Sequence, residues 1–161
     1  MNISTQKGQD DNIIRFKARL VARGFTQVCG INYLDTFAPV AKLDSICIPL
    51  AITAIEDLEA HQMDFVIALL AGDMDEAIYM EQPEGFEAGE DQVCLLLKSL
   101  YGIKQAAIIW NQKIRGYLIS TGFSQLHSDH CVYINIDTGV VIAILVDDLI
   151  SSKKTSTAST T

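Results

Sequence analysis

Two adjacent acids, Asp147 and Asp148, constrain the fold of this chain more than any other feature, because they interrupt an otherwise apolar stretch. Seven apolar residues in a row, 140–146, precede them, and Leu149 and Ile150 follow. A run of this length is typical of a buried strand. Since ionised carboxylates are costly to bury without compensation, the two acids must either face solvent in a tight turn or bind a cation.

The apolar run forms the second half of a predicted β-hairpin. Residues 131–136 alternate between apolar and polar side chains, and Asp137, Thr138 and Gly139 supply turn residues before the run begins. Two strand-like runs joined by such a turn are a strong hairpin signal. The hairpin therefore delivers the acid pair to the end of a strand.

Asp64 stands in a similar setting, within the mostly apolar residues 62–70, which predict a buried strand. Two strands that end in acid can bring their carboxylates to one point, and three carboxylates can hold two Mg²⁺ ions. Such a pair of ions clamps the attacking and leaving oxygens of phosphoryl transfer. The alternative is structural: Asp147 and Asp148 form a hairpin turn and Asp64 caps a strand. Spacing alone favours this alternative.

Two segments are predicted to be helical. The first begins at Asp44 or Ser45 and runs to about His61, although Pro49 disfavours its early turns, since an interior proline costs ~3 kcal/mol. The second covers residues 106–121 and stops at Gly122. Its helical spacing predicts these buried residues: Ile109, Trp110, Ile114, Tyr117 and Leu118.

Shorter elements complete an α+β fold with an antiparallel sheet and packed helices. The pattern predicts an exposed strand over residues 13–23, a turn at Gly72, Asp73 and Asp75, and strands at 77–81 and 93–97. We expect one domain over residues 13–150. It follows a polar N-terminal segment, 1–12, and precedes a disordered tail, 151–161, made mostly of Ser, Thr, Lys and Ala.

Composition limits the classes of function. With 161 residues, 49% of them hydrophobic, the chain has enough apolar material for one core. The net charge of −8 counts against tight nucleic-acid binding by this chain alone, although Arg15, Lys17, Arg19 and Arg23 form a local basic patch. No apolar run reaches the ~20 residues of a membrane span, and the N-terminus lacks a signal core, so an intracellular location and no membrane partner are expected.

The cysteines and histidines of the chain, which could in principle bind a metal, are predicted to have structural roles. The four cysteines are scattered without a Cys-x-x-Cys pair, which favours buried reduced thiols over a zinc site or disulfides. His127, Asp129 and His130 fall in a loop whose spacing fits no helix-borne metal site. A solvated loop is therefore expected there.

Five short motifs follow one another in order along the chain. They read Lys-Ala-Arg-Leu-Val-Ala-Arg-Gly at residues 17–24, Asp-Thr-Phe-Ala-Pro-Val at 35–40, Ile-Tyr-Met-Glu-Gln-Pro at 78–83, Lys-Ser-Leu-Tyr-Gly-Ile-Lys-Gln at 98–105 and Val-Asp-Asp-Leu at 146–149. Each motif is weak alone, but the ordered set is specific. Over residues 16–150 the chain resembles the copia-type retrotransposon reverse transcriptase family.

The resemblance implies a fragment of the fingers and palm of a right-hand polymerase, an RNA-directed DNA polymerase of a Pol polyprotein. It implies that Asp64, Asp147 and Asp148 are the catalytic acids and hold two Mg²⁺ ions, with Mn²⁺ as a substitute. The partners implied are an RNA or DNA template–primer and a dNTP. The nucleotide-binding residues implied are Lys17, Arg19, Leu69, Tyr101, Gly102 and Lys104.

The chain also departs from the family pattern. The family usually has an aromatic residue at the position of Leu69, where it screens out a 2′ hydroxyl, and a tyrosine at the position of Leu145. The resemblance implies thumb and ribonuclease H parts that these residues do not match, so we expect this chain alone to extend no primer. Two functions stay open: nucleotidyl transfer by a truncated and degraded reverse transcriptase domain, or a non-catalytic remnant that is an interaction module or has no function. The resemblance implies a location inside the cell, in a cytoplasmic particle or the nucleus.

Overall fold

The computed structural model of the chain describes residues 2–153. It divides into two compact units, the first made of Met1–Thr36 and Leu69–Ile109 and the second of Phe37–Ala68 and Trp110–Thr161. All named strands pair in antiparallel sheets, and the described residues include two α-helices. The predicted class, mixed α and β with antiparallel sheets, is therefore confirmed.

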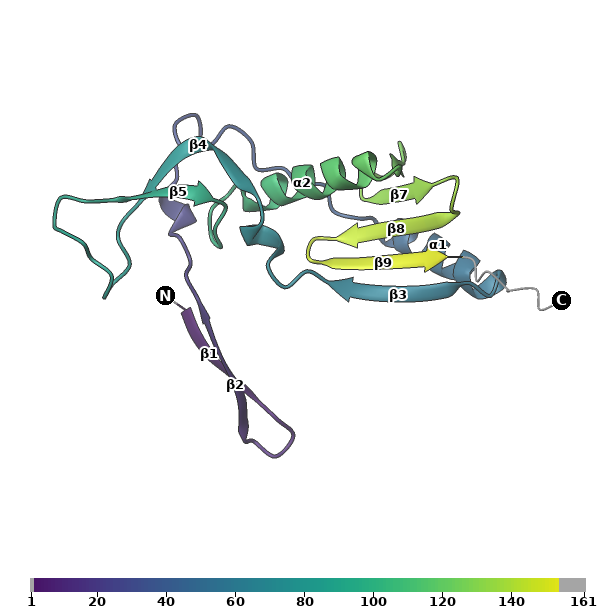
Figure 1. The fold of residues 1–161 in the computed structure, drawn as a ribbon, viewed down its shortest axis with the longest axis horizontal. Helices are drawn as coiled ribbons and strands as arrows, with labels where there is room; N and C mark the ends of the chain where they lie inside the picture. The colour runs from purple at the N-terminus through teal and green to yellow at the C-terminus, as the bar shows by residue number, and fades with distance from the viewer. Residues whose placement is uncertain (1, 154–161) are drawn as a thin grey trace. The chain divides into compact units, whose positions relative to one another are not determined.

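The second unit is built on a five-stranded sheet with the order β3-β9-β8-β7-β6; Figure 1 shows β3, β9, β8 and β7 side by side. Its strands are β3 (Glu59–Asp64), β6 (Ser124–Gln125), β7 (Val132–Asn135), β8 (Val140–Leu145) and β9 (Asp148–Lys153). β7 and β8 form the predicted hairpin, in which Asn135 pairs with Val140. The middle strands β7, β8 and β9 carry most of the buried residues of the sheet because β3 and β6 lie at its edges.

Helix α1 (Leu43–Ile55) packs against β3, β8 and β9. The predicted extension of this helix to His61 is wrong. Asp57 adopts a left-handed φ of 50°, and His61 lies in β3, where it pairs with Ser151 of β9. Pairing with β9 satisfies backbone N–H and C=O groups of residues 59–64, so these residues form a strand and do not continue the helix.

The predicted buried strand over residues 62–70 is also wrong. β3 ends at Asp64, and all six of its residues are exposed because it is an edge strand of the sheet. The chain then enters the short 3₁₀ helix η2 (Ala68–Leu70). A short apolar run cannot distinguish a buried strand from an irregular segment by its pattern alone.

Helix α2 (Ala106–Ser120) matches its prediction closely. Trp110, Ile114 and Leu118 recur every four residues and are buried, which places one helix face in a core. The helix stops before Gly122, whose φ of 89° is left-handed, as a C-terminal glycine allows. The burial predicted for Tyr117 is wrong, since this side chain is 63% exposed.

The first unit contains two antiparallel hairpins. One joins β1 (Asn2–Lys7) to β2 (Ile13–Arg19), and the other joins β4 (Asp73–Met80) to β5 (Cys94–Lys98). Between β2 and residue 36 the structure adds the 3₁₀ turn η1 (Gly24–Thr26). The turn predicted at residues 72–75 is wrong beyond Gly72, because Asp73 already pairs with Lys98.

Two boundaries of the predicted domain change. Part of the polar segment 1–12 is the strand β1, paired with β2. Ser151, Ser152 and Lys153 belong to β9, so the disordered tail predicted from residue 151 is wrong for these three residues. The remainder of that tail, residues 154–161, lies outside the described residues.

Among residues 2–153 no helix is long and apolar enough to cross a membrane. All four cysteines are free, but the expectation that all are buried is wrong. Cys29 and Cys47 are exposed, Cys94 is half-buried and Cys131 is buried. Burial raises the pKa of the Cys131 thiol to about 11, and the neighbouring charge of Asp129 adds to the effect, so this thiol stays protonated at neutral pH.

Candidate functional site

Asp64 and Asp148 lie opposite each other in neighbouring strands. Asp64 is the last residue of β3 and Asp148 is the first of β9, and the antiparallel register pairs them. Residues paired in this way have Cβ atoms ~4.5–5.5 Å apart. Gln62, two residues earlier in β3, donates a side-chain hydrogen bond to Asp148 Oδ1 at 3.4 Å. The sheet thus brings two of the predicted acids to one point.

Asp147 lies in the turn that joins β8 to β9. Leu145 pairs with Asp148, which leaves Val146 and Asp147 as a two-residue turn. Val146 has a left-handed φ of 55°, whereas Asp147 does not, as in a type II′ turn. Glycine is favoured at the first position of that turn, so valine stores strain of order 1–3 kcal/mol there.

Two aromatic residues hold this turn in place. Trp110 Nε1 donates a hydrogen bond to the Val146 carbonyl at 2.8 Å, and the Phe65 N–H donates to the Asp147 carbonyl at 2.8 Å. The two rings meet edge to face, with centroids 4.9 Å apart. The sequence predicts Trp110 as a core residue, and its role in fixing the turn has no signal in the hydrophobic pattern.

The three carboxylates form a region of uncompensated negative charge. Burial raises the pKa of Asp147, and the charges of Asp64 and Asp148 raise it further. One oxygen of Asp147, Oδ1, is buried and has no hydrogen-bond partner among the described residues. A partly buried acid beside two others is costly in the ionised form unless a cation balances it.

A divalent cation fits the chemistry of these residues, because Mg²⁺ is bound by carboxylate oxygens and Asp147 Oδ1 is an acceptor in need of a partner. Within residues 2–153, however, no group of three or more His, Cys, Asp or Glu side chains is gathered as metal ligands. The backbone therefore brings the acids together while their side chains do not converge. Asp64 and Asp148 are exposed, and exposed side chains change rotamer within nanoseconds. The backbone register, which sets the distance between their Cβ atoms, does not change with these rotamers.

In the first unit, Lys17 and Arg19 lie on one face of the β1–β2 hairpin. Arg15 shares this face because alternate residues of a strand point the same way. The register adds Gln6 opposite Arg15 and Ser4 opposite Lys17. The face therefore combines three cations with neutral hydrogen-bonding groups, which suits a phosphate-bearing ligand.

Tyr101 and Gly102 pack against residues 21–24. The Ala22 N–H donates to the Tyr101 carbonyl at 2.7 Å, and Val21 forms a parallel β-bridge with Tyr101. The guanidinium of Arg19 lies 5.7 Å from the centroid of the Tyr101 ring, within the range of a cation–π contact. Two of the predicted nucleotide-binding residues, Arg19 and Tyr101, are thus in contact.

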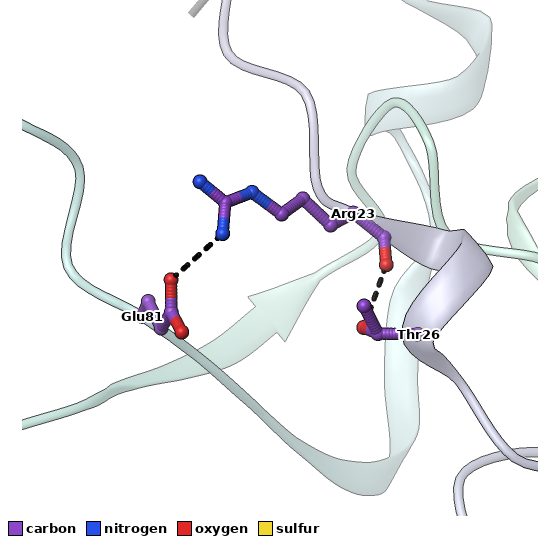
Figure 2. A network of polar contacts seen from close by, with 3 residues as sticks. All are labelled: Arg23, Thr26 and Glu81. Atoms are coloured by element: carbon purple, nitrogen blue, oxygen red, sulfur yellow. Dashed lines mark hydrogen bonds and ion pairs between the residues drawn. The ribbon is translucent and has the colours of Figure 1, made fainter.

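Arg23, also in the basic motif, pairs with an acid (Figure 2). Its Nη1 lies 3.3 Å from Glu81 Oε2, and Thr26 Oγ1 donates to the Arg23 carbonyl at 2.8 Å. Both charged side chains are exposed, so the pair adds at most ~1 kcal/mol of stability. The carboxylate nevertheless offsets one charge of the predicted basic patch.

Lys104 is exposed, but its ammonium already has partners. Nζ donates to Tyr33 Oη at 3.0 Å and to the Gln27 carbonyl at 3.2 Å, and it lies 4.7 Å from the centroid of the Tyr33 ring. An ammonium has three donors, so one remains for a ligand. Leu69, the last predicted nucleotide-binding residue, is half-buried in η2.

An acidic hollow of about 540 Å³ opens on the loop between β4 and β5, with Glu81, Glu87 and Glu90 in its lining. Phosphate is repelled by such a concentration of negative charge. The hollow is therefore a poor site for a nucleotide, and it corresponds to the acidic stretch 81–91 of the sequence.

Asp129 is not in a solvated loop, and the sequence expectation for it is wrong. It is buried, and its carboxylate accepts hydrogen bonds from the N–H groups of Lys42 and Cys131, both at 2.9 Å. Burial alone would raise the pKa of Asp129, but hydrogen bonds from Ser45, Lys42 and Cys131 and the charge of Lys42 outweigh it, so the pKa is lowered. Asp129 thus accepts a hydrogen bond from the residue that precedes α1, Lys42, and places a negative charge near the N-terminus of this helix.

Asp129→Asn is expected to lower the free energy of unfolding at pH 7 by about 2 kcal/mol, because it removes a charge that several donors stabilise. A group whose folded pKa is lowered stabilises the fold above its unfolded pKa, which is near 3.8, and this contribution is lost as the pH falls through the lower, folded pKa. Urea unfolding between pH 2 and pH 7 should show that the stability difference from wild type shrinks below pH 4. Asp137→Asn, in the exposed β7–β8 turn, is the matched control, and an equal loss in both variants would contradict the expectation.

Comparison with known proteins identifies the family. The family described as reverse transcriptase (RNA-dependent DNA polymerase) matches residues 2–159. The chain is 42% identical over 150 residues, 90% of its length, to the Retrovirus-related Pol polyprotein from transposon TNT 1-94 of Nicotiana tabacum. It is 37% identical over 92% of its length to the corresponding polyprotein from transposon RE2 of Arabidopsis thaliana. It is 31% identical over 86% of its length to the transposon Ty1-ER2 Gag-Pol polyprotein of Saccharomyces cerevisiae.

These matches cover 11%, 10% and 8% of the three relatives, so the chain spans about a tenth of their length. No solved structure matches it. The family match begins at residue 2 and ends at residue 159, so it extends beyond the residues 16–150 that the motifs cover and includes the hairpin strand β1. The copia-type resemblance is confirmed, and the chain belongs to the reverse transcriptase (RNA-dependent DNA polymerase) family.

Proposed function

We propose that this chain supplies finger and palm elements of a right-hand polymerase that transfers a nucleotide from a dNTP to a primer 3′ end on an RNA or DNA template. The observation that carries the proposal is the position of the acids, with Asp64 opposite Asp148 in the sheet and Asp147 in the adjoining turn. The five-stranded sheet of the second unit serves as the palm. The two hairpins of the first unit serve as the fingers.

Each group has a distinct task in this proposal. Asp64, Asp147 and Asp148 would hold two Mg²⁺ ions, which would supply charge stabilisation for the attacking and leaving oxygens. Trp110 and Phe65 orient the acid pair through the carbonyls of the turn. Lys17 and Arg19 bind the triphosphate by charge-assisted hydrogen bonds. Tyr101, Gly102, Lys104 and Leu69 line the nucleotide.

The second candidate function is a non-catalytic remnant. Leu145 favours it, because this half-buried residue next to the acid pair is aliphatic where the family pattern has tyrosine. Leu69 departs from the pattern in the same direction. The two candidate functions differ in whether Asp64, Asp147 and Asp148 still bind a cation.

Added Mg²⁺ is expected to raise the melting temperature of the chain. A ligand that binds only the folded state adds ~2.7 kcal/mol at one hundred times its Kd, which corresponds to about 5 °C or more for a domain of this size. Differential scanning calorimetry with increasing Mg²⁺, and separately with Mn²⁺, measures the shift. A melting temperature that both ions leave unchanged would exclude a formed site.

Asp147→Asn separates cation binding from a general effect of salt. A raised folded pKa means that the ionised acid destabilises the fold at pH values above that pKa, and protonation relieves this as the pH falls. The variant should therefore melt above wild type in metal-free buffer at pH 7 and should respond less to Mg²⁺. Asp137→Asn, which removes a charge from the exposed β7–β8 turn, should respond as wild type does.

A further inference from the structure

Gln105 is a buried polar residue that the nucleotide-binding pattern does not include. Only 5% of its surface is exposed, and it lies immediately before α2. Its Nε2 donates hydrogen bonds to the Asn32 carbonyl at 2.9 Å and to Glu76 Oε2 at 3.2 Å. Its Oε1 accepts a hydrogen bond from Gln27 Nε2 at 2.9 Å. Every polar atom of this side chain is therefore used within the first unit.

Gln27 passes this constraint to Lys104. Its Oε1 accepts from the Lys104 N–H at 2.8 Å, and its own carbonyl accepts from Lys104 Nζ at 3.2 Å. The Lys104 N–H requires an acceptor and Gln105 Oε1 requires a donor. Only one of the two orientations of the Gln27 amide meets both requirements. The side-chain pair Gln105–Gln27 thus fixes the backbone N–H of Lys104, and the backbone carbonyl of Gln27 holds the Lys104 ammonium.

The segment 101–105 is consequently held at both of its ends. Tyr101 pairs with Val21 and Ala22 through the backbone, and Lys104 is tied to Gln105 through the Gln27 side-chain amide. A loop held at two ends presents its side chains in one arrangement, which lowers the cost of ordering them when a ligand binds.

We propose that Gln105 is a positioning residue for nucleotide binding: through Gln27 it holds Lys104 and the preceding segment in the arrangement that receives a deoxynucleoside triphosphate. The inference rests on the proposed function, because it assumes that Lys104 contacts the nucleotide. Gln105 itself is buried and acts only through its neighbours. Its amide is required because the site offers one donor, Gln27 Nε2, and two acceptors, the Asn32 carbonyl and Glu76 Oε2.

Gln105→Glu tests this with almost no change in volume. It places a carboxylate 3.2 Å from Glu76, where an amide donated before, and leaves the Asn32 carbonyl without its donor. Adding Glu76→Gln restores one donor–acceptor pair with the roles reversed and removes the repulsion. Gln112→Glu makes the same chemical change on the exposed surface of α2 and is the matched control.

Two measurements on the 161-residue chain test separately whether Gln105 holds Lys104 and whether this affects nucleotide binding. The first is the hydrogen-exchange rate of the Lys104 amide. The second is the Kd for dATP with Mg²⁺, from the shift of the Gly102 and Lys104 amide signals in an NMR titration. Both should rise about tenfold in Gln105→Glu, recover in part in the double variant, where the Asn32 carbonyl still lacks its donor, and stay unchanged in Gln112→Glu.

Each other outcome decides a separate point. An unchanged Lys104 exchange rate in Gln105→Glu overturns the positioning role, whether or not dATP binds. Faster exchange without weaker dATP binding, in a wild type that binds, overturns the link to the nucleotide. A wild type that shows no shift with dATP overturns the proposed function of the segment and the nucleotide part of this inference, while the exchange rates still show whether Gln105 holds Lys104.

Discussion

Gly102→Ala is expected to lower the free energy of unfolding by about 3–5 kcal/mol. Two costs add at this position. Gly102 has a φ of 93°, a conformation that an L residue rarely adopts. An added Cβ would also overlap the Ala22 carbonyl oxygen and lie 2.8 Å from Val21 Cγ1. Because both neighbours are backbone or a stiff side chain, the pairing of Val21 and Ala22 with Tyr101 must open.

Two other glycines provide matched controls for urea unfolding followed by circular dichroism. Gly139 also has a positive φ, 67°, but nothing lies within 4 Å of an added Cβ, so Gly139→Ala should cost only about 1 kcal/mol. Gly116 lies within α2 with open space around it, so Gly116→Ala should stabilise by about 1 kcal/mol. A Gly102→Ala protein as stable as Gly139→Ala would show that the close approach of the two segments does not exist in solution.

Trp110 is the only tryptophan of the chain and reports on the second unit. Its fluorescence should follow the unfolding of the five-stranded sheet, whereas circular dichroism reports on both units. We expect Gly102→Ala to separate the two transitions, because the lesion lies in the first unit. Coincident transitions at the wild-type midpoint would contradict this.

The second large effect concerns catalysis. We expect no detectable primer extension by this 161-residue chain on an RNA template with Mg²⁺. Its net charge of −8 repels phosphate outside the basic face of β1–β2, and Leu69 and Leu145 lack the shape of the aromatic residues of the family pattern. Misplacement by ~1 Å can cost ~100-fold in rate. Robust extension by wild type that disappears in Asp148→Asn would refute the expectation while supporting the assignment of the acids.

A graft separates the effect of the surrounding polypeptide on primer extension from the effect of the two leucines. In this graft, the chain replaces the matching segment of the tobacco relative, a polyprotein about nine times longer than the chain. The graft that also carries Leu69→Phe and Leu145→Tyr is expected to extend a labelled primer. Adding Asp148→Asn to it should reduce extension at least about a thousandfold, because metal-assisted charge stabilisation is worth several kcal/mol. Asp137→Asn in the same graft should leave extension unchanged.

The outcome without the aromatic replacements is equally informative. If the plain graft extends the primer as well as the doubly changed one, Leu69 and Leu145 are compatible with catalysis within a longer polypeptide. If no graft extends it, the proposed nucleotidyl transfer by this chain is wrong and the non-catalytic alternative stands.

The local elements were predictable where neighbours in sequence decide the structure. The hairpin β7–β8 follows from alternation and an Asp-Thr-Gly turn, and α2 follows from apolar spacing with a glycine stop. Prediction failed at the end of α1 and at β3, because the local pattern of residues 56–64 does not distinguish a continued helix from a strand. There the pairing of His61 with Ser151, 90 residues further along the chain, decided the conformation.

The sequence by itself determined the family, the acid pair at the end of a strand and the basic strand β2, because motif order, turn chemistry and alternation are local properties. Only the tertiary structure decided that Asp64 faces Asp148, that Asp129 binds the Lys42 N–H before α1 and that Gln105 is linked to the Lys104 N–H through Gln27. Each of these hydrogen bonds or strand pairings joins residues that are far apart in sequence. The free energy of such contacts comes from paired backbone groups and satisfied buried polar atoms, and neither leaves a periodic signal in the chain.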